Sequence, residues 1–262
     1  MATSQRRRRL IVSGLLGGSA TLALPSTALL AWWNAYRDVY ADTGLTTPAA
    51  DGGAVAGWKD QGSSALHVTQ NTAGDRPIYR KSVAALNNKP AVEFVSNDFL
   101  IRTGLSGAII GNLNVYSIYV VFVSSDSIAA AYFYSEGNSG SATQFAAARH
   151  NLNAYEAFHR DDASVSANPT GGTTAANGAK HLLTIRRIAS NSWSVRADGV
   201  QVATAANAPT TTTINQVALG VLARNTNSLF YIGHLAQVAC YSADNFATIE
   251  PLLAAHYGIA LP

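Results

Sequence analysis

The sequence predicts an all-β protein in which two antiparallel sheets pack as a sandwich, with one short helix at the C-terminus and an extended arm at the N-terminus. Three observations predict this class: short runs rich in β-branched and aromatic residues, turn-forming residues between them, and helical spacing of apolar residues only near the end. The chain has 262 residues, of which 48% are hydrophobic and 13% charged, so it has enough apolar surface for a packed core.

We divide the chain into an N-terminal arm, residues 1–27, and one sandwich domain, residues 28–262, because no linker or internal repeat interrupts the second region. The arm contains a run of four arginines, and the rest of the chain holds 14 basic and 15 acidic residues against a net charge of +3 overall. The domain is therefore close to neutral, which argues against nucleic-acid binding there.

The arm allows two interpretations. An arginine run, an apolar stretch and small residues at Ser26 and Ala28 are typical of a cleavable, twin-arginine-like signal peptide. Glycines dilute the apolar stretch, however, and cleavage there would adjoin the first strand, which favours an arm that anchors the chain to other subunits. The stretch is too short and too rich in glycine to span a membrane. The residues that we assign to assembly are Arg6, Arg7, Arg8, Arg9 and Leu10.

The first half of the domain predicts short strands between turns rich in glycine, asparagine and serine. After a first strand in "LLAWW" (29–33), the candidates are "GAVAGWKD" (53–60), "LHVTQ" (66–70), "PIYRK" (77–81) and "KPAVEFV" (89–95). Many short strands at regular spacing are typical of sandwiches and jelly rolls.

The second half predicts longer strands. The run "VYSIYVVFVSS" (115–125) is continuously apolar, as expected for a central strand buried on both faces. Asp198-Gly199 supplies the positive φ angles of a two-residue hairpin turn between two strands. The other candidates are 130–137, 181–188, 192–199, 200–206, 215–223 and 230–242.

One helix closes the chain. A polar cluster of Ser242, Asp244 and Asn245 precedes apolar residues at helical spacing, and Gly258 ends the pattern. We expect this helix to cover the sandwich as a lid or plug. We also expect five side chains in apolar contexts to be buried: Trp32, Trp33, Trp58, Trp193 and Cys240.

Five segments, in this order, carry a resemblance to a known fold: "ALLAWWNA" (28–35), "GGAVAGWKDQGSSALHVTQ" (52–70), "RPIYRK" (76–81), "NKPAVEFVSNDFL" (88–100) and "IGHLAQVACYSADNFATIEPLLAAHYGI" (232–259). Together they resemble the concanavalin A-like (laminin-G-like) jelly-roll domains of bacterial and phage proteins. The chain departs from that pattern at Asn34, where the family has an acid, and at Gly62-Ser63-Ser64, which replaces Ser-Gly. The resemblance implies two antiparallel sheets, one of them concave, and glycan binding on the concave face or at the rim loops.

The sequence argues against an enzyme. Catalytic relatives of this superfamily carry a strand motif E-x-D-x-x-E, and no glutamate here has an acid two positions later. No histidine pair has metal-ligand spacing, and no G-x-S-x-G turn is present to seat a nucleophile. We therefore predict no catalytic residue, no metal and no cofactor.

A binding surface is the alternative to catalysis. If 130–137 is a strand, Tyr132, Tyr134 and Glu136 share one of its faces, and Tyr155, His159 and Asp161 share a face if 154–161 is extended. Aromatic rings stack on the apolar faces of sugars while acids and amides take the hydroxyls, so these six residues are candidates for glycan binding. The other interpretation is that they are ordinary half-buried sheet residues.

The functional hypothesis is a non-enzymatic phage virion protein, either head decoration or part of a tail fibre. Its arm, residues 1–27, contacts other virion subunits in an oligomeric assembly, and its lectin-like domain has host-surface glycans as candidate ligands. The location is then the virion surface. The alternative is a secreted module that binds or hydrolyses glycans and loses its arm as a signal peptide.

Overall fold

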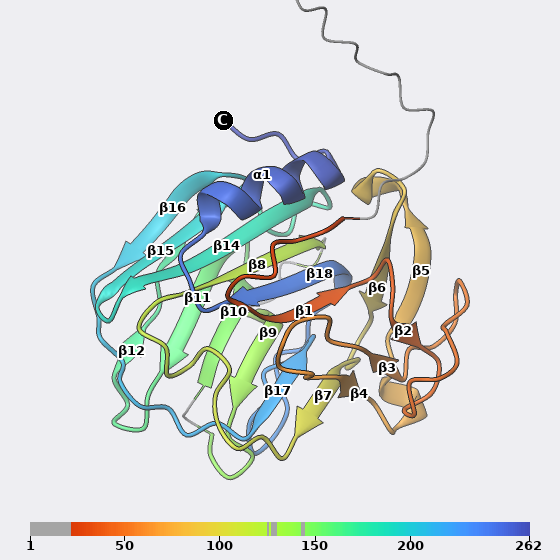
Figure 1. Ribbon diagram of the computed structural model, residues 1–262, viewed down its shortest axis with the longest axis horizontal. Helices are drawn as coiled ribbons and strands as arrows, with labels where there is room; N and C mark the ends of the chain where they lie inside the picture. The colour runs from red at the N-terminus through yellow and green to blue at the C-terminus, as the bar shows by residue number, and fades with distance from the viewer. Residues whose placement is uncertain (1–21, 125, 127–129, 143–144) are drawn as a thin grey trace, which may run out of the picture.

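Figure 1 shows a computed structural model of the chain, which describes residues 22–262 except 125, 127–129 and 143–144. Two antiparallel sheets pack face to face, and one short helix lies outside them, so the predicted β-sandwich is confirmed. The assembly residues Arg6 to Leu10 lie outside the described residues.

The first sheet, sheet A, has the strand order β16-β15-β14-β8-β18-β6-β5, and β1 also pairs with β18. Its strands are β1 (Leu29–Asn34), β5 (Ile78–Val83), β6 (Lys89–Phe94), β8 (Tyr116–Val123), β14 (Lys180–Ala189), β15 (Ser192–Ala197), β16 (Val200–Ala205) and β18 (Gly233–Tyr241).

The second sheet, sheet B, has the order β12-β11-β10-β9-β17-β7-β4-β3-β2, and β13 also pairs with β11. Its strands are β2 (Val39–Tyr40), β3 (Gly57–Trp58), β4 (Val68–Thr69), β7 (Leu100–Thr103), β9 (Ala131–Gly137), β10 (Phe145–Asn151), β11 (Ala154–Arg160), β12 (Ser166–Ala167), β13 (Thr170–Gly171) and β17 (Gln216–Leu219). The helix is α1 (Phe246–Tyr257), and two short 3-10 turns are η1 (Ala73–Asp75) and η2 (Ala84–Leu86).

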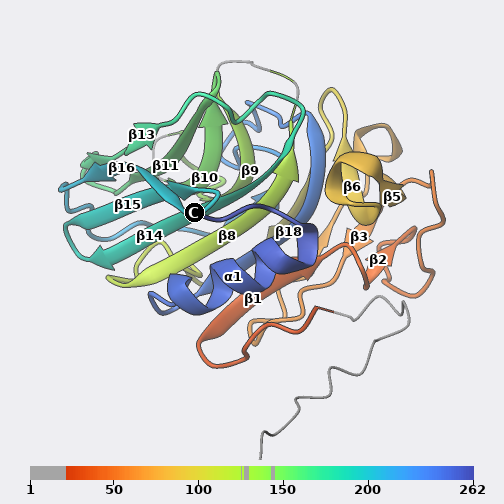
Figure 2. The same cartoon turned by 90° about the horizontal axis from the view of Figure 1, so that it is seen from above.

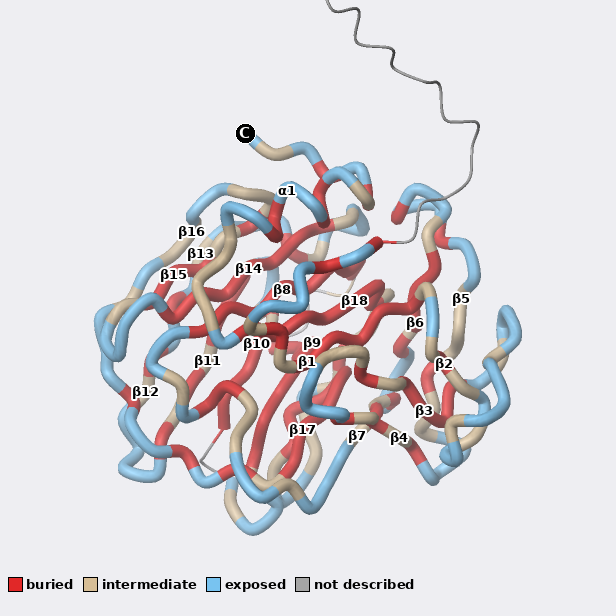
Figure 3. The backbone as a smooth tube through the Cα atoms, viewed as in Figure 1, coloured by how far each residue is buried: buried red, intermediate tan, exposed pale blue. Residues whose placement is uncertain are grey.

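The β8 strand lies in the middle of sheet A and is buried on both faces, as its apolar run predicts. Phe122 and its alternate neighbours face the main core between the sheets, whereas Tyr119 and Val121 face outward toward α1. Figure 3 shows this central burial, with exposed backbone mainly in the peripheral loops. The predicted core positions of Trp32, Trp33, Trp58, Trp193 and Cys240 are confirmed, since each is at most 5% exposed.

The α1 helix covers the outer face of sheet A (Figure 2). Ile249, Leu253 and Tyr257 pack there with outward-facing side chains of the sheet in a second apolar cluster. Leu22 and Leu24, at the start of the described chain, belong to the same cluster. The Tyr241 hydroxyl donates to the Pro25 carbonyl at 2.9 Å, so this segment is attached to the sandwich.

Local signals fix both the helix end and one hairpin. Gly258 closes α1 in the left-handed conformation, with φ +63°. Asp198 and Gly199, with φ of 49° and 81°, form the predicted turn between β15 and β16. No helix within the described ranges is long and apolar enough to cross a lipid bilayer.

Candidate functional site

The six residues predicted to bind glycan are all buried. Each is at most 1% exposed, so none offers a ring or a carboxylate to a ligand in solution, and the structure corrects the expected binding surface. The physical reason is that β9 is buried at every position, and that Tyr155 and His159 lie on the covered face of β11. The residues are Tyr132, Tyr134, Glu136, Tyr155, His159 and Asp161.

Glu136 and Tyr134 share a face, as predicted, but that face looks into the protein. The Tyr134 hydroxyl donates to Glu136 Oε1 at 2.5 Å. The carboxylate also accepts the backbone N–H groups of Ile109 and Ile110, each at 2.8 Å. Burial raises the pKa of this carboxyl. Glu136 therefore fastens the loop before β8 to sheet B.

Tyr132 does not share that face, which is a second correction. A β-bulge between β9 and β10 places Tyr132 opposite Arg149 and Tyr134 opposite Ala148, so Phe133 is the extra residue and the alternation is lost. Tyr132 consequently packs in a separate outer cluster with Phe145. Its ring lies under the Arg149 guanidinium, with 5.0 Å between the carbon and the ring centroid.

Tyr155, His159 and Asp161 have structural partners. The Tyr155 hydroxyl lies 3.1 Å from Thr174 Oγ1, and His159 Nε2 lies 2.8 Å from Thr212 Oγ1. Asp161 accepts backbone N–H groups at its own turn and from the loop that contains Thr210. These contacts tie loops to β11.

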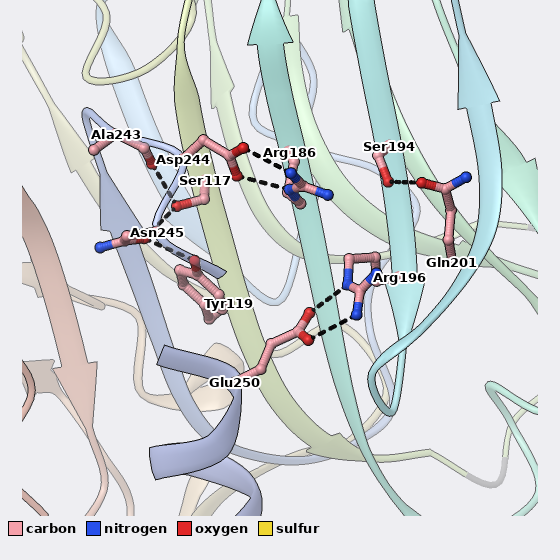
Figure 4. Close-up of polar contacts among 10 residues, drawn as sticks. All are labelled: Ser117, Tyr119, Arg186, Ser194, Arg196, Gln201, Ala243, Asp244, Asn245 and Glu250. Atoms are coloured by element: carbon pink, nitrogen blue, oxygen red, sulfur yellow. Dashed lines mark hydrogen bonds and ion pairs between the residues drawn. The ribbon is translucent and has the colours of Figure 1, made fainter. Parts of the chain in front are cut away.

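A polar network also lies on the outer face of sheet A beside α1 (Figure 4). Arg186 pairs with Asp244 through two bonds of 2.6 and 2.7 Å, and Arg196 pairs with Glu250 of the helix at 2.9 Å. The Phe246 ring lies near both guanidinium groups, at 3.8 and 4.6 Å from carbon to centroid. The network holds the start of α1 on the sheet. Its two arginines and two carboxylates neutralise one another.

Asn245, at the start of α1, completes this attachment. Its side chain does not cap the helix; its Oδ1 accepts the hydroxyls of Ser117 at 2.9 Å and Tyr119 at 2.7 Å (Figure 4). The predicted polar cluster before the helix therefore serves tertiary packing more than helix capping.

A polar cleft of about 560 Å³ lies over β4, β7 and β17, which are in the lower part of Figure 1. Smaller hollows of about 320 to 380 Å³ occur elsewhere on the sandwich. We call the larger one the amide cleft because asparagine and glutamine are five of its thirteen lining residues. The lining residues are Thr69, Gln70, Asn71, Thr72, Phe99, Ile101, Arg102, Thr103, Ser139, Gln216, Arg224, Asn225 and Asn227.

One wall of the amide cleft is the segment after β4. The Gln70 side chain crosses to the Phe99 carbonyl at 3.2 Å, and its Oε1 accepts the Thr72 N–H at 3.0 Å. From behind, the Arg76 guanidinium donates to the carbonyls of Gln70 and Asn71, at 3.0 and 3.3 Å. This wall is therefore pre-formed by its own hydrogen bonds.

The opposite wall is the loop between β17 and β18. Leu222 and Ser228 pair across it through both backbone bonds, and Gln216 Nε2 donates to the Arg224 carbonyl at 3.1 Å. The loop lies directly on β9, because a Cβ atom added at Gly137 would stand 1.6 Å from the Ala223 carbonyl oxygen. Glycine at 137 thus permits the close approach that positions Arg224 and Asn225.

Several polar groups of the amide cleft are left for a ligand. Within the described part of the chain, the side chains of Asn71, Asn225 and Asn227 and the guanidinium of Arg102 have no hydrogen-bond partner. Phe99 supplies an aromatic surface and is itself supported by Phe230, with 6.1 Å between ring centroids. The cleft thus combines one aromatic ring with unpaired amides.

The lining of the amide cleft contains neither a carboxylate nor a histidine. Hydrolysis of a glycosidic bond ordinarily needs two carboxyl groups, so this lining offers hydrogen bonding without acid-base chemistry. Over residues 22–262, with the gaps given above, no group of three or more His, Cys, Asp or Glu side chains gathers as a metal site.

The comparisons with known proteins show the fold. The binding domain of Paraclostridial Mosquitocidal Protein 1 aligns with 87% of this chain and 52% of its own, with a TM-score of 0.61 and 9% identity. This chain is a β-sandwich of the same kind. It spans about half the length of that protein's chain.

Carbohydrate-binding modules of sialidases are also similar. The CBM40 module of Ruminococcus gnavus IT-sialidase, solved with α2,3-sialyllactose, aligns with 60% of this chain and 97% of its own, with a TM-score of 0.48 and 14% identity. A leech intramolecular trans-sialidase aligns with 58% of this chain and 24% of its own, with a TM-score of 0.47 and 14% identity. No protein-family model matches the sequence, and neither does any curated protein.

The amide cleft is not predictable from the sequence, because its residues look like ordinary turn residues. The two walls contain "QNT" (70–72) and "RNTN" (224–227), which are more than 150 positions apart in the sequence. Asparagine and threonine are common in turns for local reasons, so neither segment stands out alone. Only the pairing of β17 with β7, and of β7 with β4, brings them together.

Proposed function

We propose that this domain binds saccharides in the amide cleft without chemically altering them. The observation that carries the proposal is the set of unpaired amides at Asn71, Asn225 and Asn227, which line the same cleft as the aromatic ring of Phe99. Amides donate to and accept from sugar hydroxyls, and an aromatic ring packs against the C–H face of a sugar. The volume of about 560 Å³ lies within the range of small-ligand sites. A further support is that the similar Paraclostridial domain is a binding domain.

The test is a glycan array probed with the full chain, followed by affinity measurements on the glycans that bind. Asn71→Ala combined with Asn227→Ala should weaken binding about tenfold or more, because each lost hydrogen bond costs about 0.5–1.5 kcal/mol. The matched control is Asn168→Ala combined with Asn191→Ala, two exposed asparagines that do not line the cleft. An array without any bound glycan, or equal binding by both double variants, would refute the proposal.

We propose further that the arm is retained and anchors the protein to other subunits, in an oligomeric assembly at a virion surface. Retention is supported by Leu22 and Leu24, which are 7% and 8% exposed in the apolar cluster under α1. The Arg37 guanidinium also donates to the Leu22 carbonyl at 3.3 Å. Cleavage after Ala28, as the secreted alternative requires, would remove both leucines from the fold.

Intact-mass analysis and N-terminal sequencing of the protein from its native source distinguish the two forms. We expect the mature chain to include Leu22, since its removal would expose apolar surface on sheet A. A mature chain that begins near Leu29 would contradict retention and favour the secreted form.

A further inference from the structure

The amide cleft has an unbalanced charge. Arg102 and Arg224 both line it, and its lining contains no acidic residue. Four other arginines on the sandwich pair with carboxylates at 2.5 to 2.9 Å, whereas the buried Arg187 donates to backbone carbonyls. Those pairs are Arg80 with Glu93, Arg149 with Glu156, Arg186 with Asp244, and Arg196 with Glu250.

The two cleft arginines differ in how they are held. Arg224 Nη2 donates to Ser228 Oγ at 2.9 Å, and its other contacts, at 3.4 Å, are to the carbonyls of Thr226 and Ala142. All of these partners are neutral, so the charge stays uncompensated while the side chain is oriented. Arg102 is exposed and has neither an ion pair nor a hydrogen bond among the residues the structure describes.

Arg76, which supports the wall after β4, adds a third positive charge near the amide cleft. Among the residues that the structure describes, Arg76 donates only to the carbonyls of Gln70 and Asn71. Asp75, next to Arg76 in the sequence, accepts from Asn97, and Asp98, next to Phe99, is 4% exposed and accepts the Val95 N–H. The cleft is therefore a positively charged hollow rimmed by amides, which favours an anion that also carries hydroxyl groups.

On these grounds, and on the premise of the proposed function, we infer that the ligand of the amide cleft is an acidic saccharide, with a carboxylate or sulfate group held by Arg102 and Arg224. A guanidinium forms paired, charge-assisted hydrogen bonds to such groups, which a neutral hydroxyl cannot match. Asn71, Asn225 and Asn227 then contact the neutral part of the sugar.

The experiment compares matched ligands on the full chain. Each acidic glycan bound on the array is measured beside its neutral counterpart, in which the carboxylate is reduced to an alcohol or the sulfate is removed. We expect the neutral counterpart to bind at least tenfold more weakly. Affinity for the acidic form should also fall as sodium chloride is raised, because salt screens exposed charges. The two kinds of counterpart show whether carboxylate or sulfate is preferred.

The variants test the two arginines. Arg102→Ala is expected to reduce affinity for the acidic glycan about tenfold and to leave affinity for the neutral counterpart unchanged. Arg224→Gln keeps donors for the loop contacts while removing the charge, and should act in the same direction. The control is Arg80→Ala, which removes the same charge from β5 on sheet A, outside the cleft, and should bind like the wild type.

The outcomes separate this inference from the proposed function. If only neutral glycans on the array bind the protein, or if the neutral counterparts bind as tightly as the acidic glycans, the inference fails while saccharide binding stands. If Arg102→Ala and Arg224→Gln both retain full affinity, the inference also fails. If no glycan binds at all, both fail together.

Discussion

Replacing Glu136 by alanine is expected to lower the free energy of unfolding by about 3–5 kcal/mol, since removing one partner from a buried polar network leaves the others unsatisfied. The carboxylate is fully buried and accepts one hydroxyl and the N–H groups of Ile109 and Ile110. Without it, the N–H groups and the Tyr134 hydroxyl lose their acceptor. Urea unfolding followed by tryptophan fluorescence gives the difference.

The matched control is Glu93→Ala. Glu93 also carries an ion pair, with Arg80 at 2.5 Å, but the Arg80 side chain is 40% exposed and that of Glu93 is 21% exposed. Such a pair contributes about 0–1 kcal/mol. If Glu136→Ala were no more destabilising than Glu93→Ala, Glu136 would not hold the loop before β8.

The second large effect is loss of stability in acid, to which His159 contributes together with His256, whose pKa burial also lowers to about 4. Burial lowers the pKa of the His159 imidazole to about 4, with a further contribution from the nearby Arg187 charge, while Asp161 acts in the opposite direction. The unfolded chain has the ordinary value of about 6.5. Between these values the unfolded state binds a proton that the folded state does not, so stability decreases as the pH falls from about 6.5 to about 4.

The size of this effect follows from the shift. One pKa unit corresponds to about 1.4 kcal/mol, so His159 alone accounts for about 3 kcal/mol of stability lost by pH 4. Glu136 acts against this trend, because its raised pKa favours the folded state as the pH falls. The measurement is therefore the difference between wild type and His159→Gln at each pH, in which the contribution of Glu136 cancels.

We expect His159→Gln to be less stable than the wild type at neutral pH, because the ring packs edge-on against Trp193 at 5.5 Å between centroids. The difference in free energy of unfolding between the two proteins should decrease as the pH falls toward 4. A difference that stays constant between about pH 6.5 and about pH 4 would show that His159 does not contribute to the loss of stability in acid.

The parts of the fold that were predictable are those specified by local chemistry. The continuous apolar run of β8, the turn at Asp198-Gly199 and the stop of α1 at Gly258 each follow from neighbouring residues. By contrast, β10 was not predicted, because its run of Ala146, Ala147 and Ala148 has low intrinsic strand preference. That run is a strand because β9 and β11 pair with it on both sides.

The candidate site was predicted less well, for two physical reasons. Side-chain alternation identifies which residues share a face but not whether that face is covered, so Tyr155 and His159 were assigned to a surface that the opposite sheet buries. Alternation also fails at a bulge, and the extra residue Phe133 turned Tyr132 to the other side of β9. Neither feature has a sequence signal within β9 itself.

The amino-acid sequence by itself determined the sandwich class, the central buried strand, the closing helix and a domain near electrical neutrality, because each depends on composition or on residues close together in the chain. Only the tertiary structure decided which faces are open. It buried Glu136 beneath a loop, it packed Leu22 and Leu24 on the outer face of sheet A, and it brought Asn71 and Arg224 to opposite walls of one cleft. A cleft is made by strand pairings between distant segments. Those pairings depend on how apolar residues from the whole chain are buried together.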